Sequence, residues 1–188
     1  MRIQSGIQKG RAIHPKVGAR TRPTTARVRK AIFDTLYGKF DLEGAHVVDL
    51  FAGTGSLGFE AASRGAKKVT FVESDPVTVI NLHRSVASLA REGGCEFKVI
   101  RRDALVYLGG ATATAADICF CDPPYDFDSW DRLLSSINAR FLVAESNREI
   151  PANQRWRQTT LKRYGDTVVT FLVPQQKNTE LLSREDGV

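Results

Sequence analysis

The chain has 188 residues, of which 42% are hydrophobic and 26% are charged, a composition typical of a globular protein. This length predicts one domain with a core large enough to stand without disulfide or metal cross-links. No apolar run is long enough to cross a membrane, and the first residues lack a signal peptide's apolar segment. We therefore expect a cytoplasmic protein with no membrane partner.

The cysteines and histidines give no sign of a metal centre. Cys95, Cys119 and Cys121 match neither a disulfide framework nor a zinc-binding spacing, and the three histidines are scattered along the chain. Cys119 and Cys121 lie two residues apart on a predicted strand, so they share one face and are expected to fill the core. We expect no metal ion.

The 27 Lys and Arg residues are distributed unevenly. Nine of them lie in residues 1–30, where there is no Asp or Glu, whereas the remaining chain is slightly acidic. Residues 1–30, here called the basic front, precede a slightly acidic remainder, and this distribution favours a polyanionic partner, most simply nucleic acid. The alternative is that these residues form a solvated N-terminal segment without a partner. We divide the chain into a basic N-terminal arm (1–23), a main domain (24–174) and a polar C-terminal tail (175–188).

A short hairpin is predicted at the start of the chain, where residues 2–4 would pair with residues 11–13. Prolines and glycines in the following stretch exclude a helix before residue 24. Basic side chains along this hairpin and loop would line an exposed edge that is suited to phosphate contacts.

A helix is predicted next, capped by Thr24 or Thr25 and running to about Tyr37. Apolar residues recur in it at helical spacing and should face the core, namely Val28, Ile32 and Leu36. The basic residues of this helix are expected on its exposed side, next to the basic arm. They are Arg27, Arg29 and Lys30.

The strongest pattern in the chain lies between residues 46 and 73. A buried strand over residues 46–51 runs into the glycine-rich loop Ala52-Gly53-Thr54-Gly55-Ser56-Leu57-Gly58. A short helix (59–64) and a second strand (69–73) follow this loop. Together they predict a right-handed βαβ unit, which binds its ligand at the carboxyl ends of the strands.

Two acidic residues indicate which cofactor this loop favours. The loop matches G-x-G-x-x-G and Glu73 lies twenty residues beyond Gly53, a spacing that permits a dinucleotide. Asp49, at the end of the first strand, would repel a pyrophosphate but suits S-adenosylmethionine, which carries an ammonium and a sulfonium and no phosphate. Glu73 suits either cofactor, because both carry a ribose diol. A purely structural glycine turn is the remaining alternative.

The alternation of helices and strands continues beyond this unit. A helix from Pro76, capped by Ser74 or Asp75, would end at Gly93-Gly94 and lead into a strand over residues 97–100. Asp103 comes next, where it would either accept from an adenine amine or cap a helix.

The second half of the chain completes the sheet. Further strands are predicted over residues 116–121, 141–145, 156–161 and 167–173, with a helix after Asp128 or Ser129 and a tight turn at Gly165-Asp166. These elements predict an α/β, Rossmann-like fold. Its mostly parallel, twisted seven-stranded sheet would have helices on both faces, an antiparallel C-terminal hairpin and a basic N-terminal extension.

Asp122-Pro123-Pro124-Tyr125 ends the strand over residues 116–121, because prolines cannot donate to a sheet ladder. The Asp122 carboxylate and the Pro123 carbonyl are acceptors only, so they suit an exocyclic NH2 group, which offers two donors. Tyr125 would stack on the ring that carries this amine. The two acceptors would pull the amine toward a pyramidal shape and disperse the charge that develops on its nitrogen. A Pro-Pro turn that merely ends a strand is the alternative.

The order of these motifs resembles the class I S-adenosylmethionine-dependent amino-methyltransferases. A more specific likeness, to the RsmD-like family, comes from residues 22–29 (R-P-T-T-A-R-V-R), Leu142-Val143-Ala144-Glu145 and Arg163-Tyr164-Gly165-Asp166-Thr167. The resemblance covers roughly residues 1 to 174. It implies methylation of the exocyclic N2 amine of a guanine in small-subunit (16S) ribosomal RNA, at a site of the guanine-966 type.

The resemblance also implies roles for individual residues, with 24–174 as the methyltransferase domain. Cofactor contacts are expected from Asp49, Phe51, Ala52, Gly53, Thr54, Gly55, Glu73, Ser74, Asp103, Ala104 and Asp122. The catalytic corner would comprise Asp122, Pro123, Pro124 and Tyr125. RNA contacts would come from Lys9, Arg11, Arg20, Arg22, Thr24 and Arg27. Methyl transfer would run in line from sulfonium to nitrogen.

Three other functions are compatible with parts of the pattern. The corner does not name the base, so the first alternative is a methyltransferase acting on adenine or cytosine of RNA or DNA, although the chain has no room for a DNA-recognition domain. A non-catalytic RNA-binding assembly factor that keeps the fold is the second. A nicotinamide-dependent oxidoreductase is the third, and it rests only on the glycine pattern.

Overall fold

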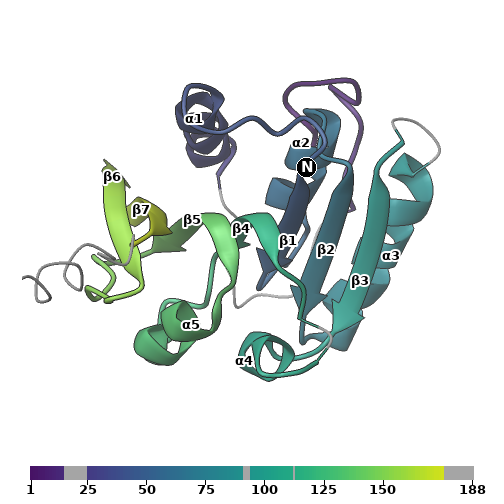
Figure 1. Ribbon diagram of the computed structural model, residues 1–188. Coiled ribbons are helices and arrows are strands. Elements are labelled where there is room, and N and C mark those ends of the chain that lie inside the picture. The colour runs from purple at the N-terminus through teal and green to yellow at the C-terminus, as the bar shows by residue number, and fades with distance from the viewer. Residues whose placement is uncertain (15–24, 91–93, 112, 176–188) are drawn as a thin grey trace, which may run out of the picture.

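The computed structural model describes residues 1–14, 25–90, 94–111 and 113–175. Its central feature is one seven-stranded sheet with helices on both faces (Figure 1). Across the sheet the strands are ordered β3, β2, β1, β4, β5, β7 and β6. The first five run parallel, and β7 is antiparallel to both β5 and β6. This arrangement confirms the predicted Rossmann-like fold and its antiparallel C-terminal hairpin.

The elements follow one another as predicted, with shifts at their ends. The strands are β1 (His46–Leu50), β2 (Lys68–Glu73), β3 (Glu96–Arg101), β4 (Ala116–Cys121), β5 (Ala139–Ser146), β6 (Trp156–Tyr164) and β7 (Thr167–Pro174). The helices are α1 (Ala26–Tyr37), α2 (Ser56–Ser63), α3 (Pro76–Leu89), α4 (Ala104–Leu108) and α5 (Trp130–Ser136). Asp75 and not Ser74 caps α3, and this helix ends before the glycine pair that was expected to stop it.

Two apolar cores lie against the two faces of the sheet, because successive residues of a strand point to opposite sides. In β1, Val47 belongs to the core that α1, α2 and α3 share, whereas Val48 belongs to the core that α4 and α5 share. Cys119 and Cys121 lie together in the second core, as predicted, and burial raises the pKa of both thiols. These thiols are therefore packing groups.

Helix α1 confirms most of its prediction and corrects one part of it. The Thr25 hydroxyl accepts from the Val28 amide at 3.2 Å, so Thr25 is the cap. The expected apolar residues Val28, Ile32 and Leu36 are buried, but so is Arg29, at 1% exposure. The prediction of an exposed Arg29 was wrong, because the N-terminal segment covers that side of the helix.

The first fourteen residues form the predicted hairpin and pack into the core. Arg2 pairs with Ala12 in an antiparallel bridge, and the Ile3 amide donates to the Arg11 carbonyl at 3.0 Å. Ile3 and Ile13 are each only 2% exposed and belong to the same core as α1 and α2. The hairpin therefore contributes apolar packing as well as basic charge.

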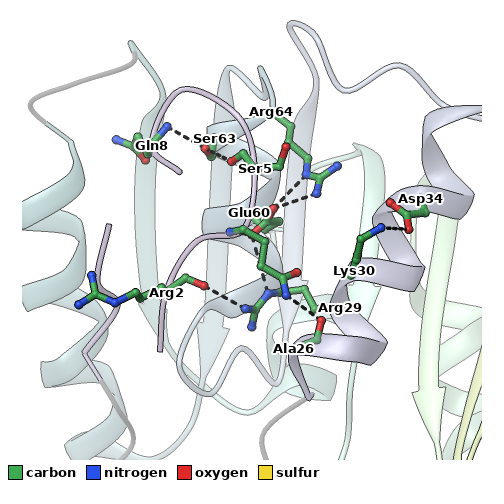
Figure 2. Close-up of polar contacts among 11 residues, drawn as sticks. Arg2, Ser5, Gln8, Ala26, Arg29, Lys30, Asp34, Glu60, Ser63 and Arg64 are labelled. Atoms are coloured by element: carbon green, nitrogen blue, oxygen red, sulfur yellow. Dashed lines mark hydrogen bonds and ion pairs between the residues drawn. The ribbon is translucent and has the colours of Figure 1, made fainter. Parts of the chain in front are cut away.

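A buried carboxylate on α2 fastens this hairpin to the rest of the fold, and Figure 2 shows its contacts. Glu60 is fully buried and accepts from the Gln4 amide at 2.8 Å and from the Arg64 guanidinium at 3.0 Å. Its third partner is Arg29, whose Nε lies 3.8 Å away. Arg29 also donates to the Arg2 carbonyl at 3.0 Å. This network places the buried Arg29 guanidinium beside a carboxylate, and an unpaired charge would be costly there.

The C-terminal strands also follow the prediction. β6 and β7 are joined by a tight turn in which Gly165 adopts a positive φ of 60°, which glycine tolerates without steric cost. A register shift between Gln158 and Thr160 marks a bulge in β6, the edge strand. Of the tail predicted over residues 175–188, only Gln175 lies within the described residues, and its amide donates to the Arg155 carbonyl at 2.7 Å.

Candidate active site

The strand order places the two main motifs next to each other. The strand order runs from β1 through β2 to β3 on one side and from β4 to β5 on the other, so it changes direction between β1 and β4. Folds of this kind bind their ligands at the carboxyl ends of the strands at this switch point. In the β1–β4 ladder, Leu50 is opposite Cys121. Phe51 and Asp122 therefore leave the sheet side by side. The glycine loop and the acid-diproline corner meet here, as the sequence predicted.

The glycine loop is a strained, closely packed turn. Gly53 and Gly55 have φ values of 55° and 74°, and Phe51, at 56°, is the single non-glycine residue with a positive φ in the described part of the chain. Such a conformation is costly for an aromatic residue and is retained where the surroundings enforce it. A side chain at Gly55 would lie 2.7 Å from atoms of Leu82 and Phe59, so this glycine allows α2 to pack closely.

Asp49 lies beneath this loop as a buried carboxyl group. It is 3% exposed, and one of its oxygens accepts from the Gly58 amide at 3.0 Å. Burial raises the pKa of Asp49 well above its usual range, and the negative charges of Asp122 and Glu73 raise it further, although the Gly58 bond opposes them. The charges of Asp122 and Glu73 thus disfavour the ionised form of Asp49, and a cation bound at this edge of the sheet would favour it.

Glu73, at the end of β2, holds the loop through its carboxylate. One oxygen accepts from the Gly53 amide at 2.8 Å, and the other accepts from the amides of Ser74 and Asp75, each at 2.9 Å. Sequence reasoning assigned Glu73 only to a ribose and missed this role. A carboxylate has about four acceptor positions, so these three bonds leave room for a ribose hydroxyl.

Asp103 caps α4 at the same edge of the sheet. Its carboxylate accepts from the Val106 amide at 3.0 Å, so the structure shows the helix-cap alternative for this residue. Ala104 is buried directly behind it. The Arg102 amide donates to the Glu73 carbonyl at 3.0 Å, which brings the end of β3 against the end of β2. Asp103 thus lies near the loop, and an adenine contact stays a prediction.

The acid-diproline corner follows β4 directly. Asp122 is half-buried, Pro123 is buried and Pro124 is exposed. The Phe127 amide donates to the Pro124 carbonyl at 2.9 Å and closes a turn that leaves Tyr125 39% exposed. An exposed aromatic ring at this edge of the sheet is available to stack on a base.

Two residues beyond the predicted set complete the corner. The Phe127 ring packs edge-on against Phe51, with ring centres 5.5 Å apart, and so joins the corner to the glycine loop. Arg148, which follows β5, donates to the carbonyls of Tyr125 and Phe127. Neither residue belongs to a motif, and the Arg148 contacts are to backbone atoms, so no sequence signal pointed to them.

Three of the residues predicted to contact RNA lie in the described part of the chain, and they do not lie at this corner. Arg20, Arg22 and Thr24 lie outside the described residues, and Arg27 is exposed on α1. Lys9 is exposed at the hairpin tip and Arg11 is half-buried, donating to the Ser88 carbonyl at 2.9 Å.

The hairpin tip lies at the amino edge of the sheet. Gln8 beside it bonds to Ser63 and Leu89, the last residues of α2 and α3. These helices run antiparallel to the strands, so their last residues mark the edge opposite the carboxyl ends of β1 and β2 (Figure 1). Lys9 and Arg11 are therefore distant from the corner.

The described residues contain no group of three or more His, Cys, Asp or Glu side chains arranged to hold a metal ion. The helices among residues 1–14, 25–90, 94–111 and 113–175 are all too short or too polar to cross a membrane.

Known proteins share both the sequence pattern and this architecture. The family model described as Conserved hypothetical protein 95 matches residues 1–173. The chain belongs to this family. The ribosomal RNA small subunit methyltransferase D of Haemophilus influenzae is 30% identical over 185 residues, which are 93% of each chain. The Bacillus subtilis protein YlbH, provisionally named an rRNA methyltransferase, is 35% identical over 159 residues, covering 80% of this chain and 84% of its own.

Solved structures agree with this result. The Escherichia coli protein yhhF, provisionally named a methyltransferase, superposes with a TM-score of 0.80 at 27% identity, over 94% of this chain and 99% of its own. Magnesium protoporphyrin IX methyltransferase from Synechocystis, solved with bound SAM, has a TM-score of 0.63 at 14% identity over 79% of each chain and shares the fold alone. The predicted RsmD-like membership and class I methyltransferase fold are confirmed.

Proposed function

We propose that this protein transfers a methyl group from S-adenosylmethionine to the exocyclic N2 amine of a guanine in small-subunit ribosomal RNA, at a site of the guanine-966 type. The observation that carries the proposal is the meeting of the acidic glycine loop and the acid-diproline corner at the β1–β4 switch point. The relatives of the family, which are named as rRNA methyltransferases, support the choice of RNA as substrate.

The cofactor is S-adenosylmethionine, and the residues at the loop fit its charges. The Asp49 carboxyl group is expected to face the ammonium group, and Glu73 keeps an acceptor position for a ribose hydroxyl. A side chain added at Gly53 would have the Phe51 carbonyl oxygen, at 3.8 Å, as its nearest neighbour among the described residues. The backbone there is therefore open to a ligand. S-adenosylmethionine supplies an electrophilic methyl group carried on sulfur.

The corner residues bind and orient the guanine amine. The Asp122 carboxylate and the Pro123 carbonyl accept its two N–H groups, and Tyr125 stacks on the base. Acceptance by both oxygens holds the amine in a pyramidal shape and stabilises the positive charge that forms on nitrogen during transfer. The proton leaves once the nitrogen is cationic, so Asp122 need not be a strong base.

Mass mapping of nucleosides tests this function directly. The purified protein is incubated with tritiated S-adenosylmethionine and naked small-subunit RNA, assembled subunits or duplex DNA, and the labelled nucleoside is identified. N2-methylguanosine in RNA or in subunits is the expected product. Label found only in duplex DNA would overturn the choice of RNA as substrate. Label in methyladenine or methylcytosine would overturn the choice of guanine as the target base. Cells that lack the protein should lose the same modification from their ribosomal RNA.

A further inference from the structure

We propose that Arg148 is a positioning residue, which holds the segment from Pro124 to Phe127 so that Tyr125 faces the target base. The expected effect of Arg148 on catalysis rests on the proposed function. The hydrogen bonds that support the inference do not depend on that function. Arg148 lies after β5, and its guanidinium donates from Nη2 to the Phe127 carbonyl at 2.9 Å and from Nη1 to the Tyr125 carbonyl at 3.3 Å.

The segment needs such a support because its sequence lacks the backbone N–H groups that would normally bond it to the neighbouring strand. Pro123 and Pro124 have no N–H group, so the chain cannot continue the β4 ladder through them. The bond from the Phe127 amide to the Pro124 carbonyl makes a turn, but it ties the segment only to itself. Attachment to the rest of the protein therefore has to come from side chains.

Two kinds of contact attach this segment to the rest of the protein, one apolar and one polar. The Phe127 ring packs edge-on against Phe51 in the glycine loop and against Trp130 at the start of α5, with ring centres 5.5 Å apart in both pairs. Arg148 supplies the polar attachment at the carbonyls of Tyr125 and Phe127. The Tyr125 ring itself stays 39% exposed, which suits a group that must meet a ligand.

The chemistry of arginine fits this task better than that of lysine. A guanidinium presents its donors in a rigid plane and reaches two carbonyls at once, whereas an ammonium is a flexible point charge. The Arg148 group is itself oriented, since Nη1 also lies 3.4 Å from the Asn147 side-chain oxygen and the Ser146 hydroxyl donates to the Arg148 carbonyl. Loss of this group should let the corner move, and a displacement of about 1 Å at a reacting centre can cost about 100-fold in rate.

The test compares Arg148→Ala with Arg148→Lys and with the control Arg140→Ala. Arg140 is an arginine at the other end of β5, 80% exposed and paired with Asp117 at 3.3 Å, so it matches Arg148 in type and strand but is remote from the corner. The first readout is hydrogen exchange of the Phe127 amide by NMR, which needs no activity. The second is kcat, KM for RNA and the dissociation constant for S-adenosylmethionine.

In Arg148→Ala we expect faster exchange at Phe127 and a fall in kcat of about 10-fold to 100-fold, with affinity for S-adenosylmethionine unchanged. Arg148→Lys should recover part of the exchange protection and part of kcat, and Arg140→Ala should behave as the wild type. Unchanged exchange in Arg148→Ala would overturn the attachment, and faster exchange with unchanged kcat would overturn the positioning role. A wild-type protein that methylates no RNA would refute the proposed function instead, while exchange would still decide the attachment.

Discussion

Asp49 is the residue whose ionisation we expect to bear most directly on cofactor binding. Its pKa is raised by burial and by the charges of Asp122 and Glu73, so the folded protein holds a proton that the unfolded chain releases. The stability of the cofactor-free protein should therefore fall as pH rises from about 4 toward the raised pKa of Asp49. Asp49→Asn should flatten that part of the profile, measured as the free energy of unfolding in urea at a series of pH values.

Cofactor affinity should change in the opposite direction over the same pH range. Only the ionised Asp49 carboxylate attracts a cation, so binding of S-adenosylmethionine by calorimetry should strengthen as pH rises. Asp49→Asn keeps an acceptor for the Gly58 amide and loses the charge. If this variant bound the cofactor as tightly as the wild type at every pH, the electrostatic role of Asp49 would be excluded.

Asp122 should act on turnover and not on cofactor binding. Asp122→Ala removes one of the two acceptors that we propose for the target amine, so kcat should fall by at least about 100-fold while the dissociation constant for S-adenosylmethionine stays within a few fold. Asp128→Ala is the control, because Asp128 is an exposed acid of the same loop. Equal losses of turnover and cofactor affinity in Asp122→Ala would contradict the role assigned to it.

The single residues divide clearly into those that sequence could predict and those that it could not. Asp49 and Asp122 were predictable because each ends a strand, and the ends of neighbouring parallel strands share one edge. The hydrogen bonds that Glu73 accepts from three amides, and those that Arg148 donates to two carbonyls, depend on the path of a loop in space. Backbone acceptors and donors have no residue type, so the sequence carries no trace of these bonds.

At the scale of elements, the N-terminal hairpin depends on the buried Glu60 of α2. Glu60→Ala would leave Arg29 and the Gln4 amide without their partner in the interior, which should lower the free energy of unfolding by about 3–5 kcal/mol. Chemical denaturation measures this loss. The control is Asp34→Ala, which breaks the Lys30–Asp34 pair on the surface, where the two side chains are 67% and 55% exposed. Exposed pairs contribute about 0–1 kcal/mol, so a similar loss in both variants would show that Glu60 does not act through buried charge.

The same hairpin explains the one clear error about α1. A single apolar stripe implies one buried face, and Arg29 lies beside that stripe. The helix has a second covered side, because residues 1–14 pack on it and give the Arg29 guanidinium the Arg2 carbonyl and Glu60 as partners. Periodicity within a helix does not reveal a distant segment that folds onto it. The strands, whose buried runs and bounding turns are local signals, were predicted more accurately.

At the scale of the whole molecule, binding of RNA should depend on the basic front of the chain. Charge reversal of Arg20, Arg22 and Arg27 to Glu should weaken RNA binding and reduce the slope of log K against log salt by about 2 to 3, since each lost phosphate contact removes close to one released counterion. Fluorescence anisotropy at several salt concentrations measures both quantities.

The control reverses three exposed bases outside this front, namely Lys98, Arg132 and Arg140. This control has the same change in net charge, so it separates a local footprint from a general effect of charge. An unchanged salt slope in the first variant, or an equal change in both, would show that the front does not contact the RNA backbone.

The separation between the hairpin tip and the acid-diproline corner sets a minimum breadth for any RNA that contacts both. α3 has fourteen residues and runs from the corner's edge of the sheet to the tip's edge, so the two lie about 20 Å apart along it. A lone nucleotide or a very short oligomer cannot reach from one to the other. A folded ribosomal particle offers a broad, rigid array of phosphates around one protruding base. With RNA contacts at the hairpin tip and methyl transfer at the corner, as proposed, only a base held at the matching distance from those phosphates would reach Asp122.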